Sequence, residues 1–118
     1  MPLIKVQTSL SAPAPDAVDT LLTTLSTELS LQLGKSEAYV MTALEADTPM
    51  TFGGTADEPV GYVEIKNIGT LTPTQTEALS QAICKHLEQQ LGIPQARTYI
   101  AFADSERHLW GWNGKTFA

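Results

Sequence analysis

The chain repeats one pattern of elements twice, and this internal repeat limits its possible folds more than any other feature. Residues 2–9 (PLIKVQTS) and 61–69 (GYVEIKNIG) are rich in aliphatic and β-branched side chains, which predicts two strands. Each is followed by a helical pattern and then by another strand pattern, at 38–46 (AYVMTALEA) and 97–103 (RTYIAFA). A crossover helix joins parallel strands. We therefore predict an α/β fold of two pseudo-repeated β-α-β units, which form a mixed four-stranded sheet with two helices on one face.

The two helices are predicted from apolar side chains that recur at intervals of three and four residues. The first pattern predicts a helix at about 16–33, after a loop at 10–15, and Gly34 is a typical helix stop. The second helix begins at Thr72, which with Gln75 forms a capping box, and ends at Gly92. The first apolar stripe consists of Val18, Leu21, Leu22, Leu25, Leu29 and Leu33, and the second of Ala78, Leu79, Ala82, Ile83, Leu87 and Leu91.

A loop rich in glycine and proline, at 47–59 (DTPMTFGGTADEP), separates the two halves. When the halves are laid over each other, Gly34 matches Gly92 and Ala38 matches Ala96. A chain of 118 residues can bury a core of its own, so we expect one domain over residues 1–118.

Charge and cysteine content exclude several classes of function. Seven Lys and Arg against thirteen Asp and Glu give a net charge of −6, which repels nucleic acids and acidic membranes. The single cysteine, Cys84, and two separated histidines support neither a disulfide nor a metal site. No apolar run could span a bilayer, and the start lacks the features of a secretory signal. We expect a cytoplasmic protein, with export by a route without a signal peptide left open.

Apolar side chains also indicate surfaces that the two helices do not cover. We place Ile4, Val6, Val63 and Ile65 on the sheet face away from the helices, where something else must cover them. The C-terminal segment adds four large apolar side chains, Leu109, Trp110, Trp112 and Phe117. Self-association would bury both features, and the alternative is a tail that folds back on its own domain.

Pro2 has two interpretations. Proline lacks a backbone N–H and has a fixed φ, so it can begin a strand without losing a ladder hydrogen bond. Alternatively, removal of Met1 would leave the ring nitrogen of Pro2 as a free secondary amine at the end of a strand, where it could act as a base. The residue alone does not decide between them.

Several strings, in order and spacing, resemble the macrophage migration inhibitory factor family. They are MPLIKV at the start, LGK at 33–35, MTFGG at 50–54, NIG at 67–69, RTYI at 97–100 and GWNGKTFA at the end. The resemblance covers nearly the whole chain. It implies a homotrimer with inward-facing sheets, an active site at each subunit boundary, and keto–enol tautomerisation of phenylpyruvate-like 2-keto acids and of dopachrome analogues without a cofactor.

The resemblance also assigns roles to individual residues. Pro2 matches the catalytic base, and Lys35 matches the cation that holds the substrate carboxylate and keeps the amine neutral; otherwise Lys35 would satisfy the last carbonyls of its helix. Ile68 matches the residue whose backbone amide binds the same carboxylate. The matching aromatic side chains are Tyr99 from the neighbouring subunit and, as pocket walls, Tyr39, Trp112 and Phe117. Trp110 stands where relatives often have a smaller aliphatic side chain, so a narrower or flatter pocket mouth is expected. Without the resemblance, each of these would more often be a core residue.

The chain also departs from the family pattern. Ala101 stands where the best-known members have an asparagine that binds phenolic substrates. The Cys-x-x-Cys of some members is absent, so no thiol oxidoreductase activity is expected. Lys66 could bring a second cation near the site, although a solvated surface charge is the simpler interpretation. A retained Met1 would make the nitrogen of Pro2 an amide without basicity.

The competing function is a cytokine-like signalling trimer that binds a protein receptor and has a weak or vestigial pocket. Intact Pro2 and Lys35 favour catalysis, whereas the changes at Ala101 and Trp110 allow a weakened site.

Overall fold

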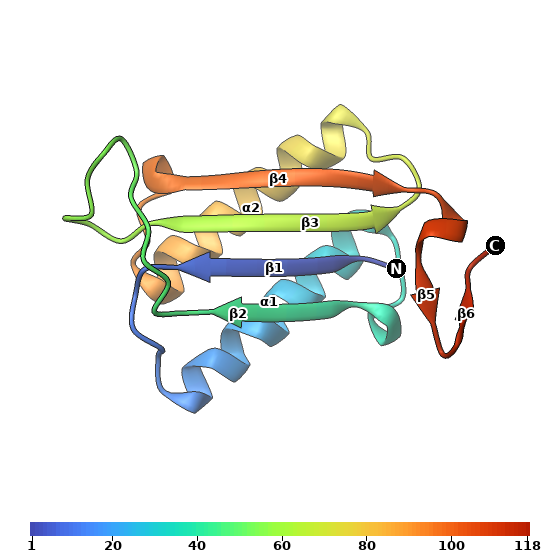
Figure 1. The fold of residues 1–118 in the computed structure, drawn as a ribbon, viewed down its shortest axis with the longest axis horizontal. Helices are drawn as coiled ribbons and strands as arrows, with labels where there is room; N and C mark the ends of the chain where they lie inside the picture. Colours follow the sequence, from blue (N-terminus) through green and yellow to red (C-terminus); the bar gives the residue numbers. More distant parts are fainter.

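A computed structural model describes all 118 residues and contains a four-stranded sheet covered on one face by two helices (Figure 1). The sheet order is β2-β1-β3-β4. The strands are β1 (Leu3–Thr8), β2 (Met41–Glu45), β3 (Gly61–Ile68) and β4 (Thr98–Ser105), and the helices are α1 (Pro15–Leu33) and α2 (Pro73–Leu91). Each helix connects two parallel strands, β1 with β2 and β3 with β4, while β1 and β3 are antiparallel. The duplicated β-α-β fold is therefore confirmed.

Both helices end where their glycines predict. Gly34 and Gly92 adopt left-handed φ values of 62° and 72°, which favour glycine because it lacks a Cβ. At the start of α2, Thr72 and Gln75 form the predicted capping box.

The residues after each helix differ from the prediction. Ala38 and Ala96 lie in short 3₁₀ helices, η1 (Glu37–Tyr39) and η2 (Gln95–Arg97), so the two halves match even here. Strand β2 begins only at Met41, which corrects the predicted strand at 38–46, and β4 runs two residues beyond the predicted end at 103.

The core lies between the helices and one face of the sheet. Its fully buried side chains include Ile4, Val6, Val63 and Ile65, all at 0% exposure. The prediction that these four lie on the uncovered face is therefore wrong. Side chains alternate along a strand, and these positions face Leu21, Leu25 and Leu29 of α1 and Leu79, Ile83 and Leu87 of α2.

The uncovered face of the sheet carries both polar and apolar side chains. Leu3, Met41, Tyr62 and Tyr99 lie on it, with Met41 64% and Tyr99 67% exposed. Lys5 lies 3.4 Å from a carboxylate oxygen of Glu64 and 4.0 Å from one of Glu45, and Gln7 donates a hydrogen bond to Glu45 at 2.7 Å. Lys66 is exposed on the same face, as expected of a solvated charge. This face therefore combines ion pairs with exposed apolar side chains, at Met41 and Tyr99, that self-association would bury.

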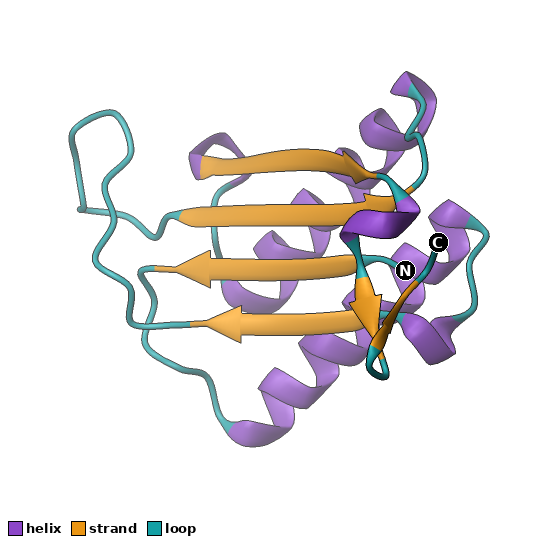
Figure 2. Ribbon diagram, turned by 45° about the vertical axis from the view of Figure 1, so that its right-hand side comes forward, coloured by secondary structure: helices purple, strands orange, loops and turns teal.

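The C-terminal segment forms a hairpin beside the end of the sheet at which the N-terminus lies (Figure 2). Its strands, β5 (Gly111–Trp112) and β6 (Lys115–Thr116), are joined by Asn113 and Gly114 at φ 52° and 77°. Positive φ at both positions is typical of a type I′ turn, for which Asn-Gly is the strongest sequence signal. Within one chain Leu109 and Trp112 stay 68% and 55% exposed, so folding back buries the tail only in part.

Candidate active site

The largest cavity lies at the end of the sheet where β1 begins and β3 and β4 end. Leu3 pairs with Lys66, and Ile68 pairs with Ser105, so the antiparallel register brings the N-terminus to the ends of both strands. The cavity has a volume of about 1230 Å³, and Pro2, Lys35, Tyr39, Ile68 and Phe117 all line it. The structure therefore brings together five of the residues that the sequence predicts for one site.

The ammonium of Lys35 is held at the end of β3 and makes no hydrogen bond to the carbonyls of α1. Its ammonium donates a hydrogen bond to the side-chain oxygen of Asn67 at 2.7 Å and another to the carbonyl of Ile68 at 2.6 Å. The backbone N–H of Lys35 donates to the carbonyl of Ser30, and the hydroxyl of Ser30 donates to the carbonyl of Lys35. These two hydrogen bonds fix the backbone just past Gly34. Lys35 forms no ion pair with a carboxylate, so its positive charge remains available to an anion in the cavity.

The cavity also disfavours a protonated amine at the start of the chain. Burial, followed by the positive charge of Lys35 and a hydrogen bond with it, holds the pKa of the Met1 amine below its usual value. Pro2 is buried directly behind Met1, and its carbonyl accepts a hydrogen bond from Met41 at 3.1 Å. In this form the nitrogen of Pro2 is an amide, and the amine in the cavity is that of Met1.

Aromatic rings form one side of the cavity. Trp112 stacks on Phe117 with 6.0 Å between the ring centroids and meets Tyr39 edge-on at 5.7 Å. Trp112 thus supports the two rings that line the cavity without lining it itself. Trp110 is half-buried outside the cavity, so within one chain it does not occupy the predicted pocket mouth.

Tyr99 lies elsewhere. It pairs in register with Tyr62, near the opposite end of β3 from Ile68, and its side chain is 67% exposed. Ala101 follows it two residues along β4 and is also exposed. Tyr99 therefore cannot serve the cavity of its own chain.

The sequence reasoning missed Asn67 and Arg107. Asn67 is 3% exposed and anchors Lys35, and it opens the string NIG, in which the family resemblance assigns a role only to Ile68. A polar residue within the apolar alternation of β3 was the available signal. Arg107 lines the cavity and donates a hydrogen bond from Nε to the carbonyl of Phe117 at 2.7 Å, which ties the last aromatic residue to the end of β4. No periodicity indicates a contact of this kind.

Other groups contribute little to the site. Cys84 lies half-buried on α2, where burial and the charge of Glu88 raise the pKa of its thiol and so disfavour a reactive thiolate. No group of three His, Cys, Asp or Glu side chains is placed to hold a metal ion. Neither α1 nor α2 is apolar enough over its length to cross a membrane.

The fold and the cavity define a class of small α/β proteins built from two β-α-β units, with the N-terminus and a lysine in one pocket. The family model described as macrophage migration inhibitory factor (MIF) matches residues 1–118. The chain belongs to this family, which lies in the tautomerase superfamily and has both tautomerase and cytokine-like members.

Individual relatives agree along the full length. The chain is 34% identical to macrophage migration inhibitory factor of Xenopus laevis over 119 residues, with all of both chains covered. It is also similar to the solved structure of a macrophage migration inhibitory factor homologue from Prochlorococcus marinus, with a TM-score of 0.92, 49% identity and coverage of 98% of this chain and 99% of that one. The structure from Trichinella spiralis gives a TM-score of 0.86 at 30% identity, covering 98% and 99%.

Proposed function

We propose that the protein is a cofactor-independent keto–enol tautomerase of phenylpyruvate-like 2-keto acids, with Pro2 as the general base after removal of Met1. The observation that carries the proposal is the shared cavity of the N-terminus and the Lys35 ammonium, which forms no ion pair with a carboxylate. A carboxylate of the substrate would bind at Lys35 and at the backbone amide of Ile68.

The environment of the amine suits it to act as a base. An ordinary α-amine is mostly protonated at neutral pH, so it is a poor base there. Burial and the charge of Lys35 already lower the pKa of the amine of Met1, and the same two causes would act on the amine of Pro2, which lies one residue deeper.

The reaction then needs only proton transfers. The nitrogen of Pro2 takes a proton from carbon 3 of the keto acid, and the electrons of that C–H bond form the double bond of the enolate. The resulting prolinium gives the proton to the oxygen on carbon 2, which completes the enol, and the reverse sequence returns the ketone. A positioned acid–base group of this kind contributes about 10²- to 10⁴-fold to the rate.

The proposal includes a homotrimer with inward-facing sheets, in which Tyr99 of one subunit completes the cavity of the next. Two observations support it: the side chain of Tyr99 is 67% exposed at the far end of the sheet, and Trp112 is left 55% exposed beside the cavity. Tyr39, Phe117 and Trp112 would receive the substrate ring, with Trp110 near the pocket mouth in the trimer.

Ketonisation of phenylpyruvate, followed by ultraviolet absorbance, tests the function. We expect turnover by protein that has lost Met1 and loss of at least about 10²-fold in Pro2→Gly, whose N-terminal amine lacks the ring. Equal rates in both proteins would remove Pro2 from the mechanism and favour a binding or signalling role.

A further inference from the structure

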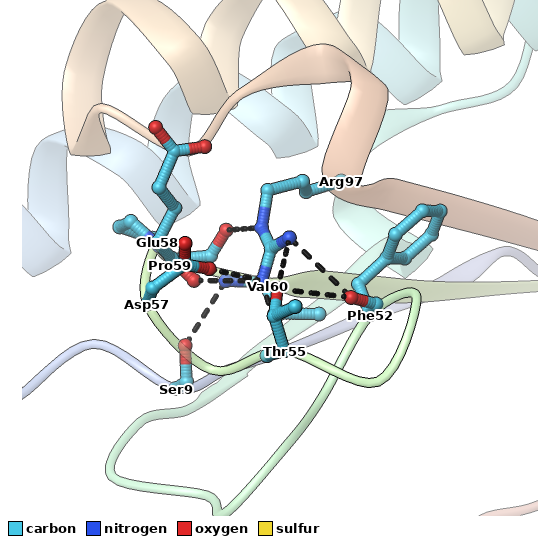
Figure 3. A network of polar contacts seen from close by, with 8 residues as sticks. All are labelled: Ser9, Phe52, Thr55, Asp57, Glu58, Pro59, Val60 and Arg97. Atoms are coloured by element: carbon cyan, nitrogen blue, oxygen red, sulfur yellow. Dashed lines mark hydrogen bonds and ion pairs between the residues drawn. The ribbon is translucent and has the colours of Figure 1, made fainter.

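The long connection between β2 and β3, residues 46–60, is tied at its two ends to the segment that follows β1, while one arginine binds its outer part, residues 52–59. Gly53 and Gly54 adopt left-handed φ values within it, and most of its side chains are exposed, so the segment has no core of its own. Figure 3 shows the guanidinium of Arg97 reaching into this loop. The side chain of Arg97 is only 12% exposed.

The contacts of Arg97 use all three nitrogens of the guanidinium. Nε donates to the carbonyl of Pro59 at 3.2 Å, Nη1 to the hydroxyl of Thr55 at 3.0 Å and the carbonyl of Phe52 at 3.4 Å, and Nη2 to the carbonyls of Thr55 and Glu58 at 3.0 and 3.1 Å. The nearest carboxylate, that of Asp57, lies at 3.9 Å and is 76% exposed. Five directed bonds to neutral acceptors need the planar fork of an arginine, which the three donors of a lysine cannot replace.

This network leads directly to Tyr99. The guanidinium carbon of Arg97 lies 5.8 Å from the centre of the ring of Phe52, and that ring lies 5.0 Å from the ring of Tyr99 at a tilt of 54°. Phe52 is the ring that packs on Tyr99, Tyr62 lies beside Tyr99 on the neighbouring strand, and no hydrogen bond fixes the Tyr99 hydroxyl. Because two thirds of the Tyr99 side chain is exposed, its orientation depends largely on Phe52.

We propose that Arg97 is a positioning residue that acts through Phe52 to hold the Tyr99 ring in the direction in which it enters the pocket of the neighbouring subunit. The inference rests on the proposed function. The loop at 46–60 would then help to bind the aromatic end of the substrate in the neighbouring subunit, far from Pro2 of its own chain.

The test is a set of double-mutant cycles with phenylpyruvate. We expect Arg97→Lys and Phe52→Leu each to raise KM about three- to tenfold, the value of one aromatic contact, with a smaller change in kcat because the proton transfer occurs elsewhere. In the Tyr99→Ser background, Arg97→Lys and Phe52→Leu should no longer raise KM, because the effects of residues that act through one another are not additive. Phe52→Leu leaves the main-chain acceptors of Arg97 in place, so this variant still tests the proposal if Arg97→Lys does not form a trimer.

His86→Ala is the control for a loss of stability alone, because it removes a hydrogen bond between the two helices. That variant should lower the melting temperature without raising KM. An equal rise in KM with and without Tyr99, or no rise at all, would overturn the role of Arg97 while leaving the proposed function intact. Absence of wild-type turnover above Pro2→Gly would instead overturn the proposed function, and this inference with it.

Discussion

The ammonium of Lys35 lies 2.7 Å from the side-chain oxygen of Asn67, so a lysine just past the end of α1 is anchored to the last residues of β3. Asn67 is 3% exposed, and its amide fixes the direction of a long side chain that would otherwise have several rotamers. The bond connects the two β-α-β units at the cavity itself.

Replacement of Asn67 by Ala should therefore weaken substrate binding. With only its bond to the carbonyl of Ile68 left, the ammonium of Lys35 is held less firmly, and we expect kcat/KM for phenylpyruvate to fall about tenfold, mainly through KM. Thr8→Val is a matched control, because Thr8 is also buried and donates to the carbonyl of Val60 at 2.8 Å, away from the cavity. Similar rises in KM in both variants would show that destabilisation, and not the anchor, explains the effect.

Removal of the charge at position 35 should change the pH dependence. Burial first and Lys35 second lower the pKa of the Met1 amine, and we expect the same two causes to act on the Pro2 amine once Met1 is removed. Lys35→Met should therefore raise the pKa of the Pro2 amine while burial continues to depress it. The rising limb of kcat against pH should move upward by about one unit, because the amine must lose its proton to act as a base. If the rising limb of kcat stays at the same pH in Lys35→Met, Lys35 does not affect the pKa of the amine.

The contact between the helices gives a pH-dependent contribution to stability. The imidazole of His86 lies 2.8 Å from a carboxylate oxygen of Glu28, and this hydrogen bond holds the pKa of Glu28 below its usual value. A carboxyl group with a depressed pKa stabilises the fold above its unfolded pKa, and this contribution is lost as the pH falls through the folded value.

Glu28→Gln should therefore lower the free energy of unfolding by about 1 kcal/mol near neutral pH. Urea titrations should show the difference from wild type shrinking as the pH falls from about 5 to about 3. A difference that is constant over this range would contradict the assignment.

The sequence predicts the topology well, because glycine stops, the capping box and helical periodicity are local signals. It does not predict which strand face is covered: Ile4, Val6, Val63 and Ile65 are recognisably apolar, but only the packed helices define the direction in which they point. Resemblance to a family brings Pro2 and Lys35 to one site, whereas the anchor at Asn67 is a contact over 32 residues that no spacing reveals.

The most direct test compares two preparations of the same chain, with and without Met1, after intact-mass measurement has fixed the fraction of each form. The rate of phenylpyruvate ketonisation should be proportional to the fraction that begins with Pro2, and protein that retains Met1 should be inactive, because its Pro2 nitrogen is an amide. Full activity in the form that retains Met1, or none in the form that begins with Pro2, would contradict the central claim that the Pro2 amine is the base.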